Sequence, residues 1–155
     1  MLELVGTGVL APTAQQVADR AGVGIRTVFR HFSEMDALYQ SMDAWLEGEV
    51  RPLLAVAPPP GGREDRARAL VRQRALFFER IAPYKRAGNL LRWRSRFLQE
   101  RHAHLQRVLR TDLLRWLPEL AEAPADLLSA LELATSFEAW DRLRGDQQLT
   151  PRSAA

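Results

Sequence analysis

The segment 24–31 gathers side chains of the types that recognise DNA. Arg26 and Arg30 are four residues apart, so a helix would place both on one face, with Thr27 beside them. Arginine donates paired hydrogen bonds to the edge of guanine, and arginine and threonine also bond to phosphate oxygens. His31 adds a further hydrogen-bonding group. We therefore interpret this segment as a helix that reads the major groove of DNA.

A helix-turn-helix over residues 13–32 would hold that helix in place. The hydroxyl of Thr13 can cap the first helix, and Gly22 can adopt the left-handed conformation that ends it. The apolar residues expected to pack the two helices together are Val17, Ala18, Ala21, Val23, Val28 and Phe32, with Ile25 on their flank.

The residues expected to contact DNA lie at the starts of both helices and along the second one. Because Arg26 is nearer the helix N-terminus, which enters the groove first, we assign it to a base edge, whereas Arg30 fits a base or a phosphate. The alternative for the whole pattern is an ordinary helical hairpin with a solvated face. The predicted DNA contacts are Thr13, Gln15, Gly24, Arg26, Thr27, Phe29, Arg30 and His31.

Composition limits the classes of protein to consider. The chain has 155 residues, is 46% hydrophobic and carries a net charge of +3, so it can bury a core in one or two domains. The positive charge is concentrated in residues 63–119, outside the helix-turn-helix, and solvated helix faces are its simplest explanation. Cysteine is absent, no apolar run is long enough to span a membrane, and no signal-peptide pattern is present. We therefore expect a cytoplasmic protein that has no membrane contact.

The rest of the chain reads as amphipathic helices, which predicts an all-α fold. A connecting helix follows the motif, and the run Pro58–Gly62 breaks the chain. We expect a helix-turn-helix domain over residues 1–50 and a helical-bundle domain for effector binding and dimerisation over residues 63–155. The expected helices are 33–55, 63–80 (ended by Ile81-Ala82-Pro83), 84–95, 96–117 and 125–144, with a further helix start at Thr150-Pro151.

Aromatic residues of the second domain are candidates for a ligand pocket. Trp93, Phe97, Phe137 and Trp140 would border a mostly apolar cavity for a small hydrophobic or aromatic molecule, although each one alone also fits a core position. No metal-ligand cluster, phosphate-binding loop or catalytic constellation is present in the sequence, so we expect no metal, no cofactor and no enzymatic activity. The segment 125–144 is apolar on two sides, which favours a homodimer through the second side.

The stretch 14–39, AQQVADRAGVGIRTVFRHFSEMDALY, resembles the DNA-binding domain of the TetR family of bacterial regulators. In that family an Ala-Gly-Val turn precedes a Thr, an aromatic residue, two polar residues and a Phe, and the resemblance covers residues 2–42. This chain has Gly24 in place of the usual Ser, Phe29 in place of a Tyr, and Ser33-Glu34-Met35-Asp36 in place of Pro-Ser-Lys-Glu, changes that weaken contacts to the DNA backbone. The matching residues are Thr27, Phe29, Arg30, His31 and Phe32.

The resemblance implies a transcriptional regulator, usually a repressor. It would bind a pseudo-palindromic operator as a homodimer and leave it when a small effector binds the body. It also implies a full helix before the motif and a further helix at the end, so we expect the sequence to be shortened at both ends. The alternative is a helical ligand-binding or interaction protein of the same fold that no longer binds DNA.

Overall fold

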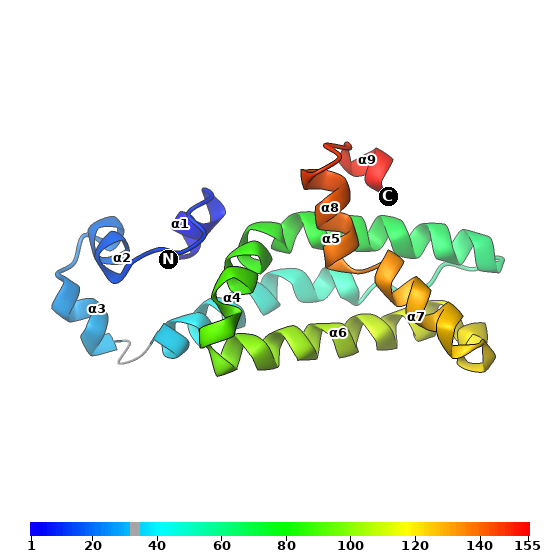
Figure 1. The fold of residues 1–155 in the computed structure, drawn as a ribbon, viewed down its shortest axis with the longest axis horizontal. Helices are drawn as coiled ribbons and strands as arrows, with labels where there is room; N and C mark the ends of the chain where they lie inside the picture. Colours follow the sequence, from blue (N-terminus) through cyan, green and yellow to red (C-terminus); the bar gives the residue numbers. More distant parts are fainter. Residues whose placement is uncertain (32–34) are drawn as a thin grey trace. The chain divides into compact units, whose positions relative to one another are not determined.

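The computed structural model describes residues 1–31 and 35–155 (Figure 1). Within these residues the fold is all-α, as predicted, and contains no strand. None of the described helices is both long and apolar enough to cross a membrane. The elements are α1 (Leu2–Gly6), α2 (Ala14–Ala21), α3 (Ile25–His31), α4 (Met35–Leu54), α5 (Arg63–Leu91), η1 (Arg92–Arg94), α6 (Arg96–Trp116), η2 (Pro118–Glu122), α7 (Ala125–Ala134), α8 (Phe137–Gly145) and α9 (Pro151–Ala154).

The chain divides into two compact units, which we describe separately. The first unit comprises residues 1–49 and 81–103, and the second comprises residues 50–80 and 104–155. The units therefore do not follow the sequence-based division into 1–50 and 63–155, which stays a prediction. The difference arises because the long helices α5 and α6 each contribute residues to both units.

The helix-turn-helix forms from local signals in the sequence (Figure 1). The hydroxyl of Thr13 accepts a hydrogen bond from the Gln16 amide at 3.2 Å, and the Gln16 side chain accepts one from the Thr13 amide at 2.9 Å. These reciprocal bonds satisfy amide groups that the first helical turn leaves without partners. Gly22 ends α2 with φ of 66°, a left-handed conformation that glycine adopts without strain. The predicted cap and C-terminal glycine are both confirmed.

Among the described residues, the core of this motif differs from the prediction at two positions. Val17, Ala18 and Val28 are buried, and Met1 and Leu4 pack against them from the N-terminal segment. Val23 is 41% exposed and Ala21 is also exposed, so the expectation that they fill the core is wrong. Val23 lies in the turn that follows Gly22, where its side chain stays accessible to solvent, and Ala21 is the last residue of α2. Phe32, the remaining predicted core residue, lies outside the described residues, as does Ser33, the first residue of the helix expected over 33–55.

Helix α5 does not end at residue 81 as predicted, but continues through Pro83 to Leu91. Pro83 has no N–H to donate to the carbonyl of Glu79, which removes one hydrogen bond of the helix. Buried apolar side chains on both sides of the proline, including Phe78, Ile81 and Ala87, compensate for that loss. Packing therefore overrides the local breaking signal.

The single helix predicted over 125–144 is instead two helices, α7 and α8. Thr135 ends α7, and Ser136 starts α8 with an extended backbone and a hydroxyl that accepts a hydrogen bond from the Ala139 amide at 3.1 Å. The Thr135 hydroxyl in turn donates to the carbonyl of Leu131 at 2.7 Å. Adjacent hydroxyl residues thus satisfy the backbone groups that a helix break exposes.

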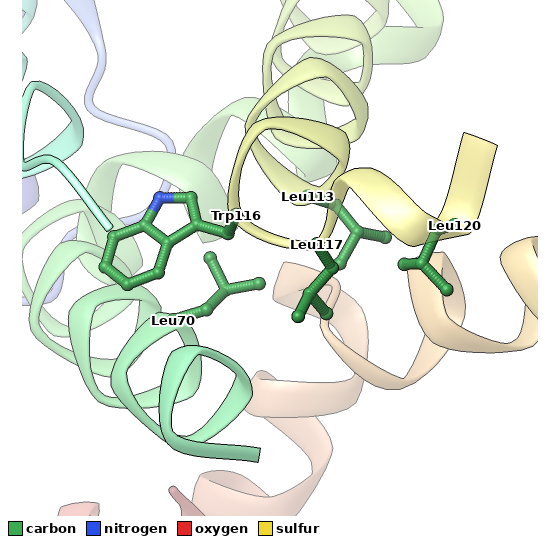
Figure 2. Close-up of a cluster of buried hydrophobic side chains, with 5 residues drawn as sticks. All are labelled: Leu70, Leu113, Trp116, Leu117 and Leu120. Atoms are coloured by element: carbon green, nitrogen blue, oxygen red, sulfur yellow. The ribbon is translucent and has the colours of Figure 1, made fainter. Parts of the chain in front are cut away.

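The second compact unit has a larger apolar core than the helix-turn-helix. Figure 2 shows Leu70 of α5 facing side chains from α6 and the segment that follows it. Leu128 and Leu131 of α7 pack against the same cluster, which we call the body core. Each fully buried leucine contributes about 1.5–3 kcal/mol relative to an exposed one. The body core consists of Leu70, Leu113, Trp116, Leu117 and Leu120.

A buried arginine cross-links three helical segments of this unit. Arg74 on α5 is 2% exposed, and its guanidinium donates hydrogen bonds to the carbonyl and hydroxyl of Thr135 and to the carbonyl of Leu109. Burial lowers the pKa of Arg74 to about 10, while the charges of Asp112 and Glu132 raise it. The side chain therefore stays protonated at neutral pH and holds α5, α6 and the α7–α8 junction together.

Candidate DNA-reading site

Helix α3 presents its polar side chains as the spacing predicted. Val28 is buried in the core of the helix-turn-helix, and Arg26 and Arg30 are exposed on another side of the helix. Thr27 is half-buried beside them. The side chain of His31 lies outside the described residues. The core contact of Val28 thus fixes which face of α3 is available to a partner.

The electrostatic surroundings of these two arginines differ from those of several others in the chain. Neither Arg26 nor Arg30 has an ion-pair partner within residues 1–31 and 35–155. At least eight other arginines pair with carboxylates, among them Arg66 with Glu119 at 2.9 Å and Arg144 with Glu79 at 2.7 Å. At least six of the fifteen basic residues of 63–119 are therefore paired inside the chain, whereas no carboxylate among the described residues pairs with Arg26 or Arg30.

Two of the predicted DNA contacts at the start of α2 are already engaged in local hydrogen bonds. The Thr13 hydroxyl caps the helix, and the Gln15 amide donates to Asp19 at 2.7 Å. Contact with phosphate would require Gln15 to exchange this bond for a new one. Gly24 is exposed, and its carbonyl accepts from the amides of Thr27 and Val28, so it stands at the start of α3.

Helix α3 also exposes apolar side chains. Phe29, a predicted contact, is 54% exposed, and Ile25 is 37% exposed although we expected it on the flank of the inward-facing stripe. The two residues are four apart and share one side of the helix, adjacent to the side that carries Arg26 and Arg30. Sequence reasoning missed Ile25 as a candidate contact, yet its spacing from Phe29 was a usable signal. We call Ile25, Arg26, Phe29 and Arg30 the reading face.

Comparison with known proteins identifies the domain that carries this face. Residues 4–42 match the family model described as bacterial regulatory proteins, tetR family. These residues form a tetR-family DNA-binding domain. The match identifies residues 4–42 as a DNA-binding domain of this family of transcriptional regulators, and the resemblance predicted from the sequence is confirmed there. No curated protein and no solved structure matches the chain.

Outside the tetR-family domain, the four predicted pocket residues fall in different compact units. Trp93 and Phe97 belong to the first unit, where Trp93 is 78% exposed and Phe97 is half-buried. Phe137 and Trp140 belong to the second unit and are buried. Both pack against Phe78, with ring centroids 5.7 and 6.4 Å apart. The structure thus brings together Phe137 and Trp140, both in contact with Phe78, which the sequence analysis did not predict as a pocket residue.

Proposed function

We propose that this tetR-family regulator is a repressor that binds a pseudo-palindromic operator as a homodimer and is released by a small hydrophobic or aromatic effector. Its site of action would be the chromosome in the cytoplasm. The observation that carries the proposal is the exposed pair Arg26 and Arg30, which lie on the side of α3 away from Val28 and have no carboxylate partner within the described residues. Two such faces in a dimer would enter successive major grooves.

The decisive experiment measures the binding of Arg26→Ala to a selected operator and to random DNA over a range of salt concentrations. A bidentate arginine contact to guanine contributes about 1–3 kcal/mol of discrimination per half-site. We expect the variant to lose affinity for the operator far more than for random DNA, with a small change in the salt dependence. Arg72→Ala is the matched control, because Arg72 is an exposed arginine of α5 outside the reading face.

Two results would contradict this assignment. If Arg26→Ala lost the same affinity for the operator and for random DNA, and the slope of log affinity against log salt fell by about one per half-site, Arg26 would be a phosphate contact. No change on either DNA would mean that α3 does not read DNA, and the proposed function would fail.

The apolar outer side of α7 supports the homodimer. Leu133 is 69% exposed, and Leu127, Ala130 and Ala134 are exposed on the same side of the helix. Leu128, Leu131 and Phe137, further apolar residues of the segment 125–144, pack within their own chain, and Phe137 is fully buried. The interface we propose is therefore limited to the outer side of α7. Sedimentation tests this interface: we expect the parent to be a dimer and the double variant Leu127→Glu/Leu133→Glu to be a monomer. A parent that is monomeric at all concentrations contradicts the proposal.

The buried aromatic rings of Phe78, Phe137 and Trp140 support an aromatic effector, because flat apolar molecules pack well against such rings. The test compares the tryptophan fluorescence of the parent with that of Trp140→Phe, so that the difference between the two spectra gives the contribution of Trp140. A compound that releases the operator is expected to change the fluorescence of Trp140. Release without any spectral change would place the effector elsewhere.

One observation favours the alternative, a helical ligand-binding protein that has lost DNA binding. Residues 1–49 carry three arginines against seven acidic residues, and one of these arginines, Arg20, pairs with Glu3 at 2.7 Å. A negative domain has less long-range attraction for DNA. Selection from a random DNA pool discriminates the two functions, since only the regulator enriches a common sequence.

A further inference from the structure

The apolar half of the reading face needs an explanation that guanine and phosphate contacts do not provide. Ile25 and Phe29 lie on one side of α3 and expose 37% and 54% of their surface. Neither side chain can donate or accept a hydrogen bond, so neither can recognise a polar base edge or a phosphate. A single exposed apolar residue is ordinary on a protein surface, but these two stand in register beside Arg26 and Arg30.

The major groove offers an apolar partner that matches this arrangement. Thymine carries a 5-methyl group on its major-groove edge, and apolar side chains contact it there. Because Ile25 and Arg26 are successive residues at the start of α3, both would approach neighbouring base pairs in the same groove. Phe29, one turn further along, extends the apolar strip in the direction of Arg30.

We propose that Ile25 and Phe29 are specificity-determining residues that read thymine methyl groups next to the guanine contacted by Arg26. This inference rests on the proposed function, because it requires α3 to lie in the major groove. The operator half-site then combines guanine, read by arginine, with adjacent thymine, read by apolar contact. Discrimination between thymine and other pyrimidines depends on burying the methyl group.

The test replaces thymine by deoxyuridine, which removes only the methyl group and leaves base pairing intact. The full chain first selects its operator from a random pool, and each thymine of a half-site is then replaced singly. Burial of one methyl group is comparable to burial of one CH₂, so we expect about fourfold weaker binding at each contacted thymine. Replacement in both half-sites together is expected to weaken binding about 15-fold.

Variants then assign the effect to the reading face. Ile25→Ala and Phe29→Ala are each expected to weaken binding to the thymine operator and to make binding insensitive to deoxyuridine at one position. Leu76→Ala is the control: it removes an exposed leucine of α5 and should keep the full sensitivity of the parent. Thermal melts of all three variants confirm that each one is folded.

The possible failures are distinguishable. Specific operator binding that is indifferent to every deoxyuridine replacement, or a selected half-site without thymine, overturns the inference and leaves the proposed function standing. Sensitivity to the methyl group that survives in both α3 variants also overturns it. Failure to select any common sequence overturns the proposed function, and the methyl-reading role falls with it.

Discussion

Helices α3 and α5 use arginine in opposite ways. Arg26 and Arg30 of α3 are exposed and have no ion-pair partner among the described residues, whereas Arg74 of α5 is buried and donates to Thr135 and Leu109. An exposed guanidinium costs little stability and remains available to guanine or phosphate. A buried one must be satisfied inside the chain, because desolvation of an unpaired charge is expensive. Position in the fold, rather than residue type, therefore separates arginines that are available to a partner from structural ones.

The apolar residues of the two regions differ in the same way. The helix-turn-helix buries the small side chains of Val17, Ala18 and Val28 and leaves larger ones exposed on α3. The second unit buries large side chains such as Trp116 and Leu113 and depends on them for stability. A small core suffices to hold the reading face in place, and it is correspondingly easy to disrupt.

The largest effect that we expect is from Arg74→Ala. The substitution removes the hydrogen bonds to Thr135 and Leu109, and it removes a buried positive charge near Asp112 and Glu132. We expect the free energy of unfolding in urea to fall by about 2–5 kcal/mol, because buried acceptors lose their donor and the side chain leaves a cavity. Arg72→Ala, two residues earlier on the same helix and exposed, should change it by less than about 0.5 kcal/mol. Equal effects of the two variants would abolish the contrast between exposed and buried arginines.

A smaller effect is expected from Ala18→Leu in the helix-turn-helix. Ala18 is fully buried where α2 meets α3, so a larger side chain forces the two helices apart and destabilises the motif by about 1–3 kcal/mol. Hydrogen exchange should show faster exchange of α2 and α3 amides, with those around Leu113 unchanged. Ala21→Leu, at an exposed position of α2, should leave exchange as in the parent. If the amides of α2 and α3 stayed protected from exchange in Ala18→Leu, the stability of the helix-turn-helix would not depend on this core.

The smallest effect concerns glycine conformation. Gly22 has φ of 66°, whereas Gly48 lies within α4, and an added Cβ would meet no atom within 4 Å at either position. Gly22→Ala is expected to destabilise the chain by about 1 kcal/mol through backbone strain alone. Gly48→Ala is expected to stabilise it by about 0.5–1 kcal/mol, because alanine favours a helix. Thermal or urea unfolding measures both, and shifts of the same sign would contradict this account.

The sequence alone determined the features that depend on neighbours within about one helical turn. Residue types and i,i+4 spacing were enough to predict the cap at Thr13, the left-handed Gly22, the buried Val28 and the exposed pair Arg26 and Arg30. These follow from local hydrogen bonding and from the geometry of a single helix. The same local rules located the start of α6 and the capped start of α9 at Thr150.

Only the tertiary structure decided the features that depend on residues distant in the chain. Helix α5 continues through Pro83 because buried side chains on both sides outweigh one lost hydrogen bond. The helix over 125–144 breaks at Thr135, where Arg74, 61 residues away in sequence, binds the freed carbonyl. Whether Ile25 faced the core or solvent also depended on how much space the other helices left beside Val28. Burial is a property of the assembled helices, so no local pattern contains it.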